Sequence, residues 1–459
     1  MMIEKVEYKG RWWLPEKPDN KISGILTFTS EEGAILDLDG VLENARGVKQ
    51  MTDPEIILGE TNDGIVTIYK CIAQSLGGGT YGDRSSYHSD IIFVGIHFHK
   101  TEDVKFNSIS IHYSHLDEWL NITGFHGLSF IGPDPTLKYS QPEPIKVIIN
   151  ENYILYFSVS IHKSSTYLGP KKIAIEEDAY ITIESQGAKS FEAFREVMGD
   201  IENFLSLGVM KPVYPLVIYG KATDSKNTIN IFYSLWCTPE QHKALAPFDM
   251  LFTYKDISNK FENILKLWFE KANILKSAHL LYFSTLYNSK QYLDYNFLSY
   301  VFALESYHRT TDSNSELPQQ EHNKRLEQIF TVVPAEHKEW LKKRLAYSNE
   351  PSFRKRLNDI YDKSIQVIEN FINYRNVFIQ KVIDTRNYLV HHDMGLKDNT
   401  AKGQSLVRLT LGLKLLLEVC LLIEIGFDPD QINTLFSKYS RYRFYKENRI
   451  LSLNEKIND

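Results

Sequence analysis

An arginine, an amide and a histidine lie close together in the segment RNYLVHH, which helical periodicity places near the end of a helix. Arg386 falls among the apolar residues of the pattern, and a guanidinium there is costly unless it is paired or faces a functional cleft. Asn387 and His391 are four residues apart and therefore share one helical face. We expect the helix to span Ser364 to His391, with Gly395 as a C-cap. The three side chains should converge at its C-terminal end.

These side chains suffice for cleaving RNA without a metal ion. A base removes the proton from a ribose 2′-hydroxyl, which attacks the adjacent phosphate, and an acid protonates the departing 5′-oxygen. Histidine titrates near neutral pH and can take either role. Arginine offers a planar fork of donors to the phosphoryl oxygens. The spacing alone does not decide the matter, because capping or ion pairing would explain the same residues.

The C-terminal half of the chain, from about Asp256, has the pattern of a soluble helical domain. Apolar residues recur at helical spacing, and prolines or a glycine separate several segments. The expected helices are 257–287, 292–309, 322–330, 336–347, 364–391 and 404–425. The most hydrophobic segment, 406–427, is interrupted by four charged residues. We therefore expect a helix buried in a bundle and no membrane span.

The N-terminal half is typical of a β domain, with short β-branched and aromatic segments separated by turns. The expected strands are 22–29, 33–38, 64–71, 90–99, 107–113, 152–162, 179–185, 214–220 and 227–234. One helix is expected from Ser190 to Leu207, with Ser190 as its N-cap. The fold class is therefore α+β, with a β-rich domain over residues 1–240 and an all-α domain over residues 250–459.

Composition narrows the class of protein further. A chain of 459 residues can build two full-sized cores. Its net charge of −6 means that any nucleic-acid site must be a local basic patch. The three cysteines, Cys71, Cys237 and Cys420, are far apart. This excludes a disulfide framework and a cysteine-rich zinc site and predicts a cytoplasmic protein, as does the charged N-terminus, which is not expected to be a signal peptide.

Two basic regions are candidates for holding RNA. In the C-terminal tail, cations alternate with aromatic rings, which suits the phosphates and bases of single-stranded or looped RNA. The candidate RNA-binding residues of the tail are Lys438, Arg441, Arg443, Lys446 and Tyr442. The second region, formed by WLKKRL and FRKRL, is equally consistent with a solvated helix face. Its cations are Lys342, Lys343, Arg344, Arg354, Lys355 and Arg356.

Two further signals lie in the N-terminal half. His97 and His99 alternate along an expected strand and so share one face, as two metal ligands would, but no third ligand is evident. The segment SLGGGTYGDRSS, which begins at Ser75, is glycine-rich but lacks the lysine of a phosphate-binding loop. We expect it to be a hairpin loop.

The string RNYLVHHD, late in a helical domain, resembles the signature of the HEPN superfamily: an arginine, a polar residue, three further residues and a histidine. The segment YNFLSYVFALESYHR is similar to the early helix of the ApeA-like branch of that superfamily. The strand-rich half, ending in FEAFREVMGDIENFLSLG, is similar to the domain that accompanies ApeA-like modules. The resemblance spans most of the chain. It implies a prokaryotic anti-phage endoribonuclease that shuts down its host by cutting RNA, with paired motifs across a homodimer.

By this resemblance Arg386, Asn387 and His391 are expected to be catalytic, with His392 as the alternative to His391. Glu305 is expected either to orient Arg386 through an ion pair or to be a carboxylate on the helix surface. No metal and no cofactor is expected at the site. The substrate would be RNA, with tRNA as an analogy, and a phage-derived trigger would act on the β-rich domain.

Two rival hypotheses remain open at the level of the sequence. In the first, the helical domain is a non-catalytic HEPN module that binds nucleotide, RNA or a partner protein, and the motif serves recognition. In the second, the N-terminal domain is the active part and the helices only dimerise, although no catalytic set is evident there. Incubating the protein with RNA and EDTA and mapping the ends produced would separate the enzyme from both rivals.

Overall fold

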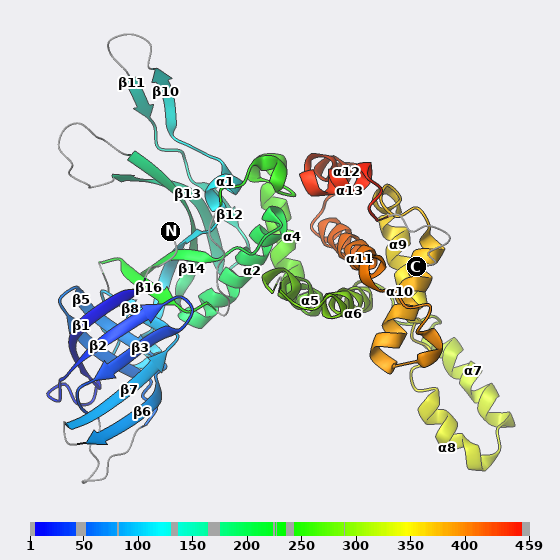
Figure 1. The fold of residues 1–459 in the computed structure, drawn as a ribbon, viewed down its shortest axis with the longest axis horizontal. Coiled ribbons are helices and arrows are strands. Elements are labelled where there is room, and N and C mark those ends of the chain that lie inside the picture. The colour runs from blue at the N-terminus through cyan, green and yellow to red at the C-terminus, as the bar shows by residue number, and fades with distance from the viewer. Residues whose placement is uncertain are drawn as a thin grey trace. The chain divides into compact units, whose positions relative to one another are not determined.

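The computed structural model describes residues 5–42, 52–79, 82–129, 136–163, 175–223, 225, 227–235, 243–288 and 290–451. Their contacts divide the chain into two compact units, Met1–Glu262 and Asn263–Asp459. The first unit is rich in strands and the second is helical, which confirms the α+β fold class (Figure 1).

Antiparallel strands dominate the first unit. In chain order they are β1 (Val6–Trp13), β2 (Ile22–Thr29), β3 (Gly33–Leu38), β4 (Ile56–Thr61), β5 (Gly64–Tyr69), β6 (Ile72–Gly79), β7 (Gly82–Ser89), β8 (Ile91–Val94), β9 (Lys105–Tyr113), β10 (Phe125–Ser129), β11 (Thr136–Tyr139), β12 (Ile145–Ile148), β13 (Tyr153–Lys163), β14 (Ile175–Ser190), β15 (Pro215–Lys221) and β16 (Ile229–Tyr233). Among the described residues, β10 and β11 pair with each other. The remaining strands form one sheet in the order β12-β13-β14-β9-β15-β16-β8-β5-β4-β1-β2-β3-β7-β6.

The sheet has two apolar faces to cover: strands β1 to β8 enclose one core, and helix α2 (Phe191–Val209) covers β9 and β14. Trp12, Leu26 and Phe28 are fully buried in the core, and contacts between β3 and β8 show that this part of the sheet folds over itself. Helix α2 begins as predicted, because the Ser190 hydroxyl accepts a hydrogen bond from the Ala193 amide at 3.3 Å. The shorter helices of this unit are α1 (Leu116–Leu120) and α3 (Tyr254–Ile257), with single turns η1 (Thr101–Asp103) and η2 (Pro247–Asp249).

One prediction for the first unit was wrong, and another was right only in part. Strand β8 ends at Val94, so His97 and His99 do not lie on one strand face. The His97 ring instead bonds the carbonyl of Gly59 through Nε2 at 2.8 Å, which accounts for its position without a metal. The glycine-rich segment from Ser75 lies in a hairpin, as predicted, but its described residues belong to the paired strands β6 and β7 and not to a loop.

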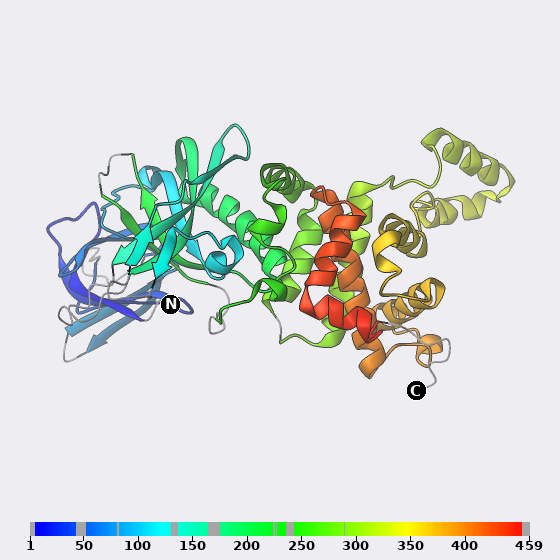
Figure 2. The same cartoon turned by 90° about the horizontal axis from the view of Figure 1, so that it is seen from above.

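The second unit is a helical bundle. Its helices are α4 (Phe261–Ile274), α5 (Lys276–Tyr287), α6 (Leu293–Thr311), α7 (Gln319–Val332), α8 (Ala335–Arg344), α9 (Phe353–Ile368), α10 (Arg375–His391), α11 (Gly403–Glu424), α12 (Pro429–Lys438) and α13 (Ser440–Glu447), with a single turn η3 (Met394–Leu396). Helix α11 contacts α6 and α9, which form the centre of the bundle with it. Helices α7 and α8 extend from the others as a pair (Figures 1 and 2).

Helix α11 is the buried helix that the sequence predicts. Leu409, Leu413 and Leu417 are fully buried in the single chain, and so is the carboxylate of Glu418. Its apolar surface is therefore covered by neighbouring helices of the same chain. Among the described residues, no helix is long and apolar enough to span a membrane.

The long helix predicted from Ser364 to His391 is in fact two helices. Helix α9 ends at Ile368 and α10 begins at Arg375. Between them, Phe371 and Ile372 are buried, and the Phe371 ring packs edge-on against Phe436 at 5.8 Å. Tertiary packing thus breaks a segment whose apolar spacing favours one continuous helix.

Candidate active site

Helix α10 is anchored to α9 at its first residue. The Arg375 guanidinium forms a two-pronged ion pair with Asp362, with Nη–Oδ distances of 2.5 and 2.9 Å, and lies over the Tyr361 ring. This arrangement lowers the pKa of Asp362, mainly through the hydrogen bond from Arg375. On the other side, the Thr385 hydroxyl accepts from the Ala401 amide at 3.1 Å. Because α10 is held at both points, its C-terminal turn has a defined position.

Arg386 is the centre of the candidate site on that turn. Its Nη1 donates to the Asn387 side-chain oxygen at 3.1 Å and to Nε2 of His391 at 3.3 Å. The guanidinium also lies over the ring of Phe353, with Cζ 5.8 Å from the ring centre. Its Nε is buried and has no hydrogen-bond partner among the described residues. Asn387 and His391 therefore both contact the guanidinium of Arg386, which lies on the same helix.

The two histidines that the sequence left as alternatives make different contacts. Both are exposed, but His391 bonds Arg386, whereas the His392 ring lies edge-on to Tyr388 with 6.2 Å between ring centres. His392 also has a left-handed backbone, with φ of 52°, and its amide bonds the Tyr388 carbonyl. His392 is thus the residue at which α10 ends. The prediction that Gly395 caps this helix was wrong, since Gly395 lies within η3.

Sequence reasoning missed a chain of polar side chains that joins α9 to α10. Arg354, near the start of α9, donates to the side-chain oxygen of Gln380, and Gln380 donates to Asp384 at 2.8 Å. Arg354 is exposed. Phe353 and Arg354 lie more than thirty residues before Arg386, so no local spacing could connect them. The four-residue spacing of Tyr388 and His392, by contrast, was a helical signal present in the sequence.

Glu305 is not paired with Arg386. Its carboxylate bonds Arg309, four residues later on α6, at 3.2 Å, and Arg309 also bonds Glu350 at 2.6 Å. Among the described contacts this resolves the alternative in favour of a helix-surface ion pair. Pairs of this kind contribute little to stability when they are exposed.

The basic region of WLKKRL and FRKRL does not form one uniform surface. Arg356 is 1% exposed and donates to Nδ1 of His308 at 3.1 Å and to Asn314 at 2.5 Å. His308 in turn bonds Asp359 at 3.2 Å, and burial lowers the pKa of His308. Arg356 is therefore part of a buried polar network and cannot hold RNA.

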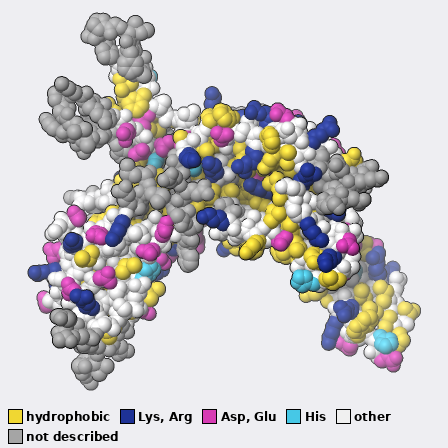
Figure 3. All heavy atoms as spheres, viewed as in Figure 1, with side chains coloured by type: hydrophobic (Ala, Val, Ile, Leu, Met, Phe, Trp, Pro, Cys, Tyr) yellow, Lys and Arg dark blue, Asp and Glu magenta, His cyan; other side chains and the backbone are white. Residues whose placement is uncertain are grey.

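The C-terminal tail keeps only part of its predicted surface. The Tyr442 side chain is buried, packs against Phe436 and donates to the buried Glu418. It cannot stack on a base, which corrects the prediction. Arg441, Arg443 and Lys446 are exposed, whereas Lys438 is half-buried. Over the face of the helical unit shown in Figure 3, Lys and Arg side chains are spread among Asp and Glu and do not gather in one patch.

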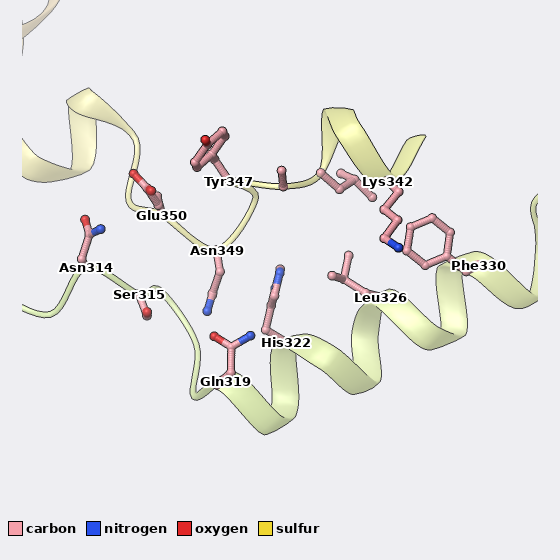
Figure 4. A pocket seen from close by; sticks show the side chains of 12 residues that line it. Asn314, Ser315, Gln319, His322, Leu326, Phe330, Lys342, Tyr347, Asn349 and Glu350 are labelled. Atoms are coloured by element: carbon pink, nitrogen blue, oxygen red, sulfur yellow. The ribbon is translucent and has the colours of Figure 1, made fainter. Parts of the chain in front are cut away.

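The helical unit also contains a pocket of about 460 Å³ between α7, α8 and the segment that follows α8. In Figure 4 the His322 ring points toward that segment, and the Lys342 side chain lies beside the Phe330 ring. Arg386, Asn387 and His391 do not line this pocket. The candidate site is thus a helix end with an exposed histidine, separate from this pocket.

The fold and the site together define a class: a β-rich domain followed by a helical domain with an arginine, an amide and a histidine in contact at one helix end. A family model described as ApeA N-terminal domain 1 matches residues 7–268, and one described as Apea-like HEPN matches residues 298–431. The chain therefore belongs to the ApeA-like HEPN family, as the sequence predicted, and this membership supports a role in anti-phage defence. No curated protein and no solved structure matches it.

Proposed function

We propose that the helical unit is a metal-independent endoribonuclease of an anti-phage system that acts by abortive infection. The observation that carries the proposal is the pair of hydrogen bonds from Arg386 Nη1 to Asn387 and His391. Arginine has no acceptor, so Nε2 of His391 must accept and the ring proton must lie on Nδ1. An imidazole in this state is the base that 2′-hydroxyl attack requires.

Each side chain then has a distinct role. His391 removes the 2′-hydroxyl proton, and Arg386 binds the phosphoryl oxygens as charge develops on them. Asn387 positions the guanidinium through the bond to Nη1. We propose that the acid that protonates the leaving 5′-oxygen is His391 of a second copy, brought to the site in an isologous homodimer.

We propose a division of labour between the two parts of the chain. Residues 250–459 cleave RNA, because the motif lies within them, and residues 1–240 respond to a phage-derived trigger. The exposed cations Arg441, Arg443 and Lys446 on α13 contact the RNA backbone. No step of this chemistry uses a metal ion or a cofactor.

The decisive experiment is incubation of the purified full-length protein with total RNA and with tRNA in EDTA. The expected products carry a 2′,3′-cyclic phosphate and a 5′-hydroxyl, which end-specific labelling identifies. Cleavage that appears only when Mg²⁺ replaces EDTA, with a 5′-phosphate on the products, would point to a metal-dependent nuclease and contradict the proposal. The protein is purified both from uninfected cells and from phage-infected cells. If both preparations bind RNA and neither cleaves it, the rival in which the motif serves recognition is favoured.

A further inference from the structure

A histidine and two aspartates of the first unit meet at a place that the proposed function does not use. They come from three elements: His112 from β9, Asp117 from α1 and Asp178 from β14. One ligand atom from each residue lies within 4.8 Å of the other two. Nε2 of His112 is 3.7 Å from Oδ2 of Asp117.

The backbone of Ala179 orients two of these side chains. Its carbonyl bonds Nδ1 of His112 at 2.9 Å, and its amide donates to Oδ1 of Asp117 at 2.7 Å. Nδ1 must donate to the carbonyl, so the neutral ring turns the lone pair of Nε2 toward Asp117. The Tyr180 ring, 5.6 Å from the His112 ring, packs against the imidazole.

With the ring neutral, Nε2 of His112 and Oδ2 of Asp117 are two lone-pair donors that face each other, as two ligands of one metal ion do. At 3.7 Å the two atoms are too far apart for a good hydrogen bond, which needs about 2.7–3.2 Å. They are close to the spacing of about 3.4 Å that two ligands of one tetrahedral Zn²⁺ adopt. A backbone carbonyl on the second ring nitrogen is the arrangement that metal-binding histidines commonly have.

We infer that His112, Asp117 and Asp178 form a binding site for one divalent transition metal, with Zn²⁺ as the ion that fits an imidazole and two carboxylates. Three protein ligands leave a fourth position for water. The Asp117 side chain is 44% exposed and the His112 side chain 13%, so the ion can enter from solvent on the aspartate side. The ion would join helix α1 to β9 and β14, which are neighbouring strands of the sheet.

The sharpest test compares Asp117→Asn with Asp90→Asn in the full-length protein. Asparagine at 117 keeps an oxygen for the Ala179 amide and loses only the charge that a cation needs. Asp90 is the matched control, because it faces His88 at 4.0 Å without a third ligand among the described residues. Zn²⁺ is titrated by calorimetry into protein from which metal has been removed with a chelator.

Wild type and Asp90→Asn are expected to bind one Zn²⁺, and Asp117→Asn and His112→Gln to bind at least tenfold more weakly. At a Zn²⁺ concentration of about 100 times Kd, the Tm of wild type should rise by roughly 5 °C. Co²⁺ in place of Zn²⁺ should give visible absorption bands that His112→Gln lacks. No binding by folded wild type, or equal binding by wild type and both site variants, would overturn the inference. None of these readouts depends on RNA cleavage, which is assayed in EDTA.

Discussion

The guanidinium of Arg386 donates through Nη1 to Nε2 of His391 at 3.3 Å, five residues further along α10. The same Nη1 holds the Asn387 side chain at 3.1 Å. In the proposed mechanism the two groups have opposite tasks, a cation for the phosphate and a base for the hydroxyl, and the structure shows them in contact. When a phosphate binds Arg386, the bond to His391 can be exchanged for bonds to phosphoryl oxygens, which frees Nε2 to accept a proton.

Arg386→Ala and His391→Ala are each expected to reduce RNA cleavage about 100-fold or more, because each removes a group that acts in the transition state. The double variant should be scarcely worse than either single variant, since both serve one event. Tm should change by no more than about 3 °C, because neither side chain is deeply buried. Initial rates on a defined RNA and thermal melts measure both. Full activity of Arg386→Ala would contradict the ribonuclease proposal.

His392→Ala is expected to keep most of the cleavage activity, in contrast to His391→Ala. The reason is that the His392 ring packs on Tyr388 and only His391 bonds Arg386. Alanine at 392 must adopt the same left-handed backbone, so a decrease in the free energy of unfolding on the order of 1 kcal/mol is expected. Cleavage rates of the two variants, compared at equal folded fraction, decide between the histidines. Loss of activity in His392→Ala alone would reverse the assignment.

Asn387→Asp tests whether Asn387 only positions Arg386. Aspartate keeps an oxygen for Nη1 but adds a negative charge where a phosphate must approach. We expect KM for RNA to rise about tenfold, with the effect larger at low salt, where charges are less screened. Asn387→Ala should instead lower kcat and leave KM nearly unchanged. If both variants lower kcat equally with no change in KM, Asn387 has a role other than positioning.

Local signals explain what the sequence predicted well. The strands follow from β-branched segments between turns, and Ser190 caps α2 because its hydroxyl reaches the Ala193 amide within the same turn. Arg386, Asn387 and His391 could be placed together because one helical turn joins them. Each of these arrangements depends on residues close together in the chain.

Contacts between distant residues explain what the sequence did not reveal. The break before α10 depends on Phe371 packing against Phe436, and apolar residues at helical spacing do not reveal such a contact. The spacing of the tail predicted that Tyr442 stacks on a base, but its hydroxyl bonds the buried Glu418. The sequence does not reveal that contact, because Glu418 lies on another helix. The His112 cluster joins residues as far apart as 66 positions, the difference between 178 and 112. Residue types indicate which chemistry a side chain can perform, but contacts between distant parts of the chain determine which side chains lie together.

The triple variant in which Arg441, Arg443 and Lys446 are all changed to alanine should bind RNA more weakly. The slope of log K against log salt should become shallower by roughly 2, since each phosphate that is no longer neutralised accounts for about 0.7. All three are exposed, so Tm should be unchanged. Tyr442→Phe is the contrast: it should leave the salt slope intact and lower stability by about 1–3 kcal/mol, because Glu418 loses a buried partner. Binding isotherms at several salt concentrations measure the slope. An unchanged slope in the triple variant would show that α13 does not contact RNA.

His279 gives the helical unit a defined sensitivity to acid. Its ring is stacked on Trp268 at 4.8 Å, and burial lowers its pKa to about 4. Because the unfolded ring titrates near 6.5, the contribution of neutral His279 is complete above about pH 6.5 and is lost as the pH falls toward 4. In His279→Phe, which keeps an aromatic ring on Trp268, the free energy of unfolding relative to wild type should rise by on the order of 3 kcal/mol between pH 7 and pH 4. Denaturant unfolding at each pH measures this difference, with the exposed His337→Gln as a control that should follow wild type. A difference between His279→Phe and wild type that does not vary with pH would show that His279 is not the group that titrates.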